Sequence, residues 1–186
     1  MNPSVILAIF RRNLNSYLNT PTGYVFICLF VLLCSAATFC LPEFFNANLA
    51  NLDQLNKWIA PILLIFIPAI TMSIWAEERR QGTDELLLTI PASDLDVVLG
   101  KFFAATGIYT ISLFFTMLCN FIMLMILSKN QLDFSLFLVT FFGYWLMGEA
   151  MLSIGMIASF LTNNLTVSYI LGMILNMPLV ILQYSS

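Results

Sequence analysis

Five long apolar stretches, separated by short polar ones, dominate the pattern of hydrophobic and polar positions along this chain. They cover residues 23–41, 59–76, 102–128, 136–161 and 165–184. The hydrocarbon core of a bilayer is about 30 Å thick, and an α-helix of about 20 residues crosses it. Each stretch therefore predicts a transmembrane helix, and the predicted fold class is all-α, a polytopic membrane helix bundle. Because no soluble domain lies between the stretches, residues 1–186 are expected to form a single membrane-spanning domain.

A different pattern precedes the first stretch. Over residues 2–20, apolar side chains recur at helical spacing along one face, and Asn2 followed by Pro3 is a helix-start signal. These features predict an amphipathic helix that lies in the membrane interface. A signal peptide is the alternative, because Arg11 and Arg12 precede an apolar run. The four further spans favour the interfacial helix.

Composition supports the membrane class and excludes others. Hydrophobic residues make up 60% of the chain and charged residues only 9%, whereas a soluble domain has about a quarter of its residues charged. The net charge is -3 and the sequence contains no run of basic residues, so no nucleic-acid partner is expected. The absence of histidine removes the commonest general base and transition-metal ligand. The cysteines lie in apolar stretches without CxxC spacing, so we expect buried thiols and no metal site. They are Cys28, Cys34, Cys40 and Cys119.

Basic residues set the predicted orientation. With a cytoplasmic N-terminus, the cytoplasmic side carries Arg11, Arg12, Arg79, Arg80 and Lys101, and the outer side carries Lys57 and Lys129. The positive-inside rule therefore predicts that the N-terminus is cytoplasmic. Trp58 and Trp75, about 25 Å apart along a helix, mark the two interfacial levels of the second span. Pro61 and Pro68 predict a kink between them.

Most of the charge is concentrated in residues 75–101, which this orientation places in the cytoplasm. Gly82 predicts the end of the helix that continues the second span, and the acids after it suit the first turn of a new short helix. Pro91 stops that helix, and Ser93 with the acid three residues later resembles a capping box that starts the third span. Three successive leucines on a short helix outside the bilayer predict a partner surface. The alternative is a solvated loop whose charges only fix the topology.

Three segments resemble a known family. From Glu77, the sequence E-E-R-R-x-G-T-x-E-x-L-L-T-x-P-x-S, followed by L-G-K, resembles the intracellular coupling loop of type-2 ABC transporter permeases, and most of all their gliding-motility branch. From Ile9, I-F-R-R-x-L-x-S-Y-L-x-T-P-x-G-Y is similar to the N-terminal elbow helix of that family. Residues 155–164 resemble its pattern after the fourth span. The resemblance covers nearly the whole chain.

The resemblance implies a function in which this loop docks on a separate ATPase subunit. Carried over by position, the ATPase-coupling interface consists of Glu77, Glu78, Arg79, Arg80, Gly82, Thr83, Glu85, Leu87, Leu88, Thr89, Pro91 and Ser93. The family also implies a second permease chain, identical or different, and a bacterial inner membrane. Its permeases usually have six spans with both ends cytoplasmic, so this chain is expected to lack the last one.

The leading hypothesis is therefore the membrane-spanning subunit of an ATP-driven exporter. The only Gly-Lys pair, Gly100 and Lys101, lacks the rest of the phosphate-binding motif G-x-x-x-x-G-K-[ST]. No enzyme activity and no cofactor are expected in this chain, and ATP and Mg would be bound by the partner ATPase. The alternative is a non-transporting membrane anchor or assembly subunit that recruits an ATPase. The sequence does not indicate a substrate.

Two polar residues in the last two spans have the same predicted depth. Glu149 precedes Phe160 by eleven residues and Asn176 follows Leu165 by eleven, which puts both about 16 Å from the cytoplasmic interface. We expect them to form an intramembrane polar pair, with the acid neutral because no Lys or Arg lies at that depth. A role in a substrate or proton path is the functional alternative. We favour a structural bond, worth about 0.6 kcal/mol, in which case Glu149→Gln leaves transport largely intact.

Overall fold

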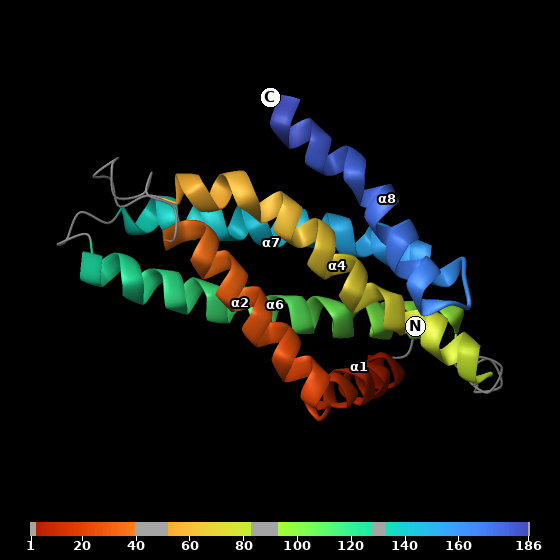
Figure 1. The fold of residues 1–186 in the computed structure, drawn as a ribbon. Helices are drawn as coiled ribbons and strands as arrows, with labels where there is room; N and C mark the ends of the chain where they lie inside the picture. Colours follow the sequence, from red (N-terminus) through yellow and green to blue (C-terminus); the bar gives the residue numbers. More distant parts are fainter. Residues whose placement is uncertain (1–2, 40–51, 83–92, 128–132, 186) are drawn as a thin grey trace.

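The computed structural model describes residues 3–39, 52–82, 93–127 and 133–185, and all the regular structure assigned in them is helical. The helices are α1 (Pro3–Leu18), α2 (Pro21–Phe39), α4 (Asp53–Gln81), α6 (Asp94–Leu127), α7 (Phe134–Phe160) and α8 (Leu165–Ser185) (Figure 1). The predicted all-α membrane helix bundle is confirmed.

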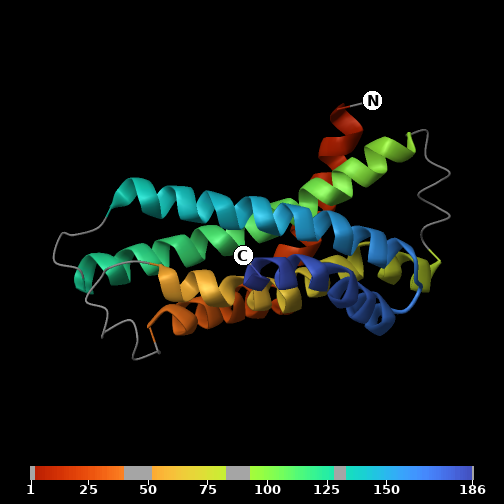
Figure 2. The ribbon, with the colours of Figure 1, turned by 90° about the horizontal axis from the view of Figure 1, so that it is seen from above.

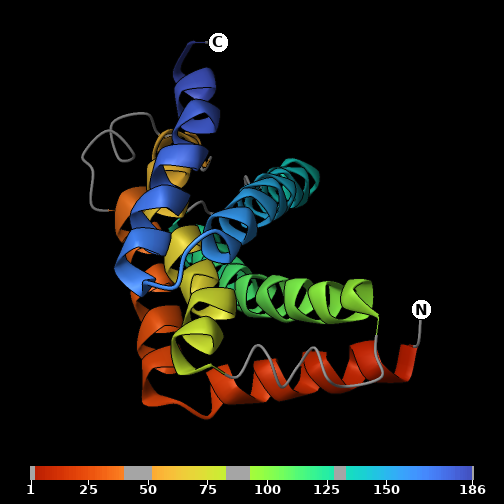
Figure 3. The ribbon, with the colours of Figure 1, turned by 90° about the vertical axis from the view of Figure 1, so that its right-hand side faces the viewer.

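Within the described ranges, four helices are long and apolar enough to cross a membrane on their own, namely α4, α6, α7 and α8. The helices α1 and α2 form a bent pair with an angle of 75° between them, and this pair supplies a fifth candidate span. The 19 residues of α2 extend about 28 Å, close to the bilayer thickness. Figure 3 shows α1 leaving the end of α2 almost at a right angle. In a membrane that α2 crosses, α1 therefore runs close to the membrane plane.

The central helix of the bundle is α4, which contacts α2, α6, α7 and α8. Its core side chains are Leu55, Ile59, Leu63, Ile67 and Ile70, each at most 4% exposed. Their spacing of three to four residues follows one face of a helix. The helix continues through both Pro61 and Pro68. The predicted kink at these prolines stays a prediction.

The apolar face of α1 packs on α6, not on lipid alone. A Cβ atom on Gly100 would lie 2.9 Å from the side chain of Ile9, and one on Gly107 would lie 3.4 Å from the ring of Phe10. The two glycines are seven residues apart, so they share one face of α6 and leave room for α1 to cross it. The apolar face of α1, which the sequence pattern assigned to the membrane interface, thus also packs against α6.

One end of the bundle gathers the cytoplasmic segments of the predicted topology. The last turn of α4, the first turn of α6, the end of α7 and the start of α8 all lie at the same end (Figures 1 and 2). The described part of the chain stops at Gly82, just after α4, and resumes at Ser93, just before α6. The candidate site is at this end.

Candidate functional site

The first boundary of the site is the end of α4. Gly82 has φ of +66°, in the left-handed region, and its N–H donates to the carbonyl of Arg79 over 3.2 Å. A side chain disfavours this conformation, so glycine suits the position. The predicted helix end at Gly82 is confirmed. Six predicted interface residues lie outside the described residues, namely Thr83, Glu85, Leu87, Leu88, Thr89 and Pro91.

The second boundary is the start of α6. The N–H of Asp96 donates to Oγ of Ser93 over 3.3 Å, which is the side-chain cap expected of Ser93. Asp94 and Asp96 both lie in the first turn, where the helix dipole favours negative charge. Residues 83–92 are therefore bounded on both sides by capped helix ends.

A buried lysine joins these two helices. Nζ of Lys101 on α6 donates to the carbonyl of Ile74, 2.7 Å away, and forms an ion pair with Oε2 of Glu78 on α4. The ammonium also lies 3.9 Å from the centroid of the Trp75 ring, within cation–π range. The side chain of Lys101 is only 1% exposed. A lysine buried this deeply requires pairing of its charge.

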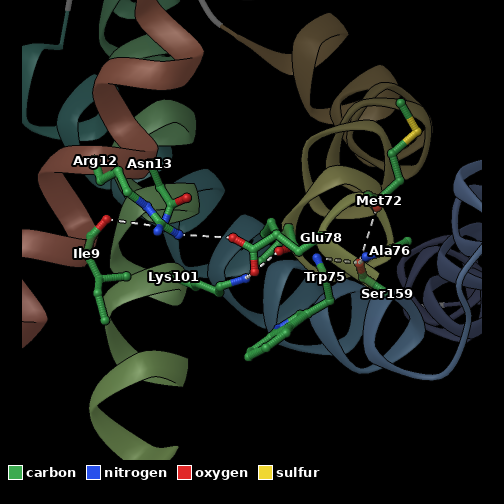
Figure 4. A network of polar contacts seen from close by, with 10 residues as sticks. Ile9, Arg12, Asn13, Met72, Trp75, Ala76, Glu78, Lys101 and Ser159 are labelled. Atoms are coloured by element: carbon green, nitrogen blue, oxygen red, sulfur yellow. Dashed lines mark hydrogen bonds and ion pairs between the residues drawn. The ribbon is translucent and has the colours of Figure 1, made fainter. Parts of the chain in front are cut away.

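The other oxygen of the same carboxylate ties down α1. Oε1 of Glu78 lies 3.0 Å from Nη2 of Arg12, so one carboxylate links two cations from two other helices (Figure 4). We call Arg12, Glu78 and Lys101 the Glu78 brace. A second tie reinforces it, because the hydroxyl of Tyr17 donates to the carbonyl of Ile70 over 2.9 Å. A cavity of about 80 Å³ beside Lys101 is large enough to hold water near the ammonium.

The end of α7 is bound to α4 on the opposite side of the brace. Nη1 of Arg79 donates to the carbonyl of Phe160 over 2.6 Å, and the guanidinium lies 4.4 Å from the centroid of its ring. Oγ of Ser159 accepts hydrogen bonds from the N–H groups of Trp75 and Ala76, at 3.2 and 3.3 Å (Figure 4). The last turn of α4 is thus held by α1, α6 and α7 together.

Nearly the whole chain matches one known family. The sequence model of the family described as ABC-2 family transporter protein matches residues 8–184. The chain belongs to this family. It is therefore a multi-pass membrane permease subunit of an ABC transporter, a kind of subunit without an ATPase of its own. Comparisons with curated proteins and with solved structures gave no match. The match does not distinguish branches of the family, so the gliding-motility assignment stays a prediction.

The charged residues before Gly82 are not equivalent in this permease. Glu78 and Arg79 point back onto the bundle and bind α1, α6 and α7, as described above. Arg80 is exposed. Glu77 belongs to α4, and its side chain is outside the described part of the structure. Within the described set, Arg80 and Ser93 are therefore the exposed side chains of the predicted interface.

The structure gives Glu149 and Asn176 partners other than each other. Oε2 of Glu149 accepts a hydrogen bond from Oγ1 of Thr106 on α6 over 2.7 Å. Nδ2 of Asn176 donates to the carbonyl of Gly172 on its own helix over 2.9 Å. The expected bond between the two side chains is absent. Equal depth does not decide which neighbour a side chain faces, and Glu149 faces α6 while Asn176 belongs to α8.

Sequence reasoning missed several residues that build this site in the permease. Lys101 and Arg12 were predicted to set the orientation but were given no partner, and Ser159 was given no role. A signal for Lys101 exists, because a single lysine between Gly100 and the apolar run of α6 needs a partner. Nothing in the spacing identifies that partner as Glu78.

Proposed function

We propose that this permease is the membrane-spanning subunit of an ATP-driven exporter in a bacterial inner membrane, with a cytoplasmic N-terminus. It couples ATP hydrolysis by a separate ATPase subunit to transport. The observation that carries the proposal is the Glu78 brace. It joins the two helices that flank residues 83–92, the segment that resembles a coupling loop, in a chain that belongs to the ABC-2 family.

The brace supports a mechanical role for that segment. A load on residues 83–92 acts on the end of α4 and the start of α6, which Lys101 and Glu78 hold together. The ion pair of Arg12 with Glu78 connects this end of α4 to α1, and the hydrogen bond of Arg79 to Phe160 connects it to the end of α7. Packed helices move as units between discrete arrangements and do not deform continuously. A movement of the segment is therefore expected to act on all four of these helices.

The partners follow from the same proposal. The exposed leucines expected in residues 83–92 bind the ATPase subunit, which holds ATP and Mg, and a second permease chain completes the translocation unit. The non-transporting anchor remains the second candidate, because a braced segment would hold a recruited ATPase equally well.

Co-purification tests the partner. The tagged full-length chain is purified from the membrane of its own cells, and an ABC ATPase subunit is expected to accompany it. Leu87→Asp should abolish that co-purification. Leu161→Asp is the matched control, since Leu161 is 65% exposed at the same end of the bundle but outside the segment. Absence of any ATPase with the unaltered chain, or equal loss in both variants, would contradict the proposal.

A second measurement separates exporter from anchor. The purified complex is placed in lipid vesicles, and ATP hydrolysis is followed while candidate compounds are added. An exporter is expected to hydrolyse ATP faster when a transported compound is present. An ATPase rate that no compound changes, together with no ATP-dependent accumulation of any compound, supports the anchor.

A further inference from the structure

A groove of about 490 Å³ lies between α6 and α7 near the brace. Val98 and Phe102 of α6 line one wall, and Met156 and Ile157 of α7 line the other. Apart from Ser153, the lining side chains are apolar or aromatic. The groove sits in the half of the bundle that contains the helix ends of the candidate site, and its shape and lining suit the apolar body of a ligand.

The end of the groove toward the bilayer centre carries an acid. Thr106 follows Phe102 by one helical turn, and Glu149 precedes Ser153 by one turn, so the Thr106–Glu149 hydrogen bond lies directly beyond the groove. Glu149 as a whole is only partly buried. Its Oε1 atom is buried and accepts no hydrogen bond from the described residues.

This oxygen needs a donor. An unsatisfied buried polar atom costs about 1–3 kcal/mol, and more when the group is charged. An ionised acid near the bilayer centre costs about 3 kcal/mol on insertion scales. Asn176, the partner expected from the sequence, is bonded within its own helix. Among the residues that the structure describes, the carboxyl group of Glu149 therefore lacks a full set of partners at the end of an apolar groove.

We propose that the groove binds an amphiphilic ammonium compound, with its apolar body between α6 and α7 and its ammonium group on the carboxylate of Glu149. The proposal names a substrate class for the exporter and so rests on the proposed function. An ammonium group supplies the missing donor, and its positive charge stabilises the ionised form of Glu149, whereas a ligand carboxylate supplies neither.

The flanking cations fix the direction of the ligand. At the other end of the groove, the ring of Trp75 already makes a cation–π contact with the ammonium of Lys101. The ring of Phe160 makes one with the guanidinium of Arg79. Both charges repel a ligand cation at that end. The ammonium group is therefore expected at Glu149 and the apolar tail toward the aromatic rings.

Photolabelling of the full-length chain in lipid vesicles tests the site. The probe is dodecylamine with a diazirine in its chain, and the labelled peptides are mapped by mass spectrometry. We expect labels in residues 98–102 and 153–160, with competition by dodecylamine and not by dodecanoic acid. Ile157→Trp, which fills the groove, should remove this labelling. Val139→Trp is the matched control, because Val139 is also exposed on α7 but does not line the groove.

Glu149→Gln tests the role of the acid. It should weaken amine binding about tenfold or more, as expected when a charge-assisted hydrogen bond is lost. Thr106→Val keeps the carboxyl group and should keep amine labelling, which guards against a folding defect in the glutamine variant. Equal labelling in Glu149→Gln, or equal competition by dodecanoic acid, would overturn the proposal and leave Glu149 with a structural role only.

The ATPase co-purification is measured in the same variants. Ile157→Trp and Glu149→Gln should both retain the partner, because neither lies in residues 83–92. If the ATPase co-purifies and the amine does not label the groove, this inference fails and the proposed function stands. If the amine labels the groove and no ATPase accompanies the chain, the binding site stands and the exporter function fails.

Discussion

Replacing Glu78 by glutamine is expected to destabilise the protein more than replacing its buried partner Lys101 by methionine. The two members of the pair differ in what they leave behind. Without Glu78, the ammonium of Lys101 keeps only the carbonyl of Ile74 and the ring of Trp75 among the contacts described above. Without Lys101, Glu78 keeps its ion pair with Arg12.

Burial sets the magnitudes. The side chain of Lys101 is 1% exposed, so the loss of its counter-charge in Glu78→Gln should cost about 3 kcal/mol of unfolding free energy. Lys101→Met loses a hydrogen bond and a cation–π contact, each worth about 1 kcal/mol, but it also removes the cost of burying an ammonium group. We expect a net cost of about 1 kcal/mol. The double variant contains neither charge of this pair and should also cost about 1 kcal/mol.

Unfolding of the purified protein in detergent micelles by added SDS measures these free energies, with helix content followed by circular dichroism. Arg11→Gln is the control, because Arg11 is exposed on the same helix as Arg12 and should have almost no effect. The decisive comparison is the double-mutant cycle, in which Lys101→Met should rescue Glu78→Gln by about 2 kcal/mol. Additive costs, or a larger cost for Lys101→Met, would refute the assignment of the brace.

Three further substitutions test the packing around the site by the same unfolding measurement. Gly155→Val should cost about 2 kcal/mol, because a Cβ atom there would lie 2.6 Å from Oγ1 of Thr71; Gly143→Ala, in open space, should cost nothing. Ser159→Ala should cost about 1 kcal/mol through the lost bonds to α4, and an unchanged stability would argue against them. Gly82→Ala should cost about 1 kcal/mol from backbone strain alone, since no atom of the described residues lies within 4 Å of its Cβ position.

The helices were predictable because a membrane makes secondary structure depend mainly on length and composition. A chain in hydrocarbon must satisfy its backbone internally, so an apolar run of sufficient length becomes a helix. The capped start of α6 was predictable for a similarly local reason, since Ser93 reaches only three residues along the chain. Each of these features depends on neighbours in sequence.

The contacts between helices were not predictable, because hydropathy does not say which way a helix turns. The apolar face of α1 suits lipid and protein equally, and only the glycines of α6 select protein. The depth of Glu149 was computed from its position in the span, but its partner Thr106 depends on the rotation of α7 against α6. Arg12 and Glu78 are 66 residues apart in sequence, and Lys101 and Glu78 are 23 apart. Neither pairing leaves a periodic signal.

The brace and the groove share the same two helices, which has a mechanical consequence for the proposed exporter. On α6, Lys101 of the brace is adjacent to Phe102 of the groove. On α7, Phe160 both binds Arg79 and lines the groove. A displacement of residues 83–92 that moves α6 relative to α7 must therefore change the width of the groove. The same movement stretches or relieves the Thr106–Glu149 bond at its end, so the affinity for a ligand there becomes coupled to the position of the segment.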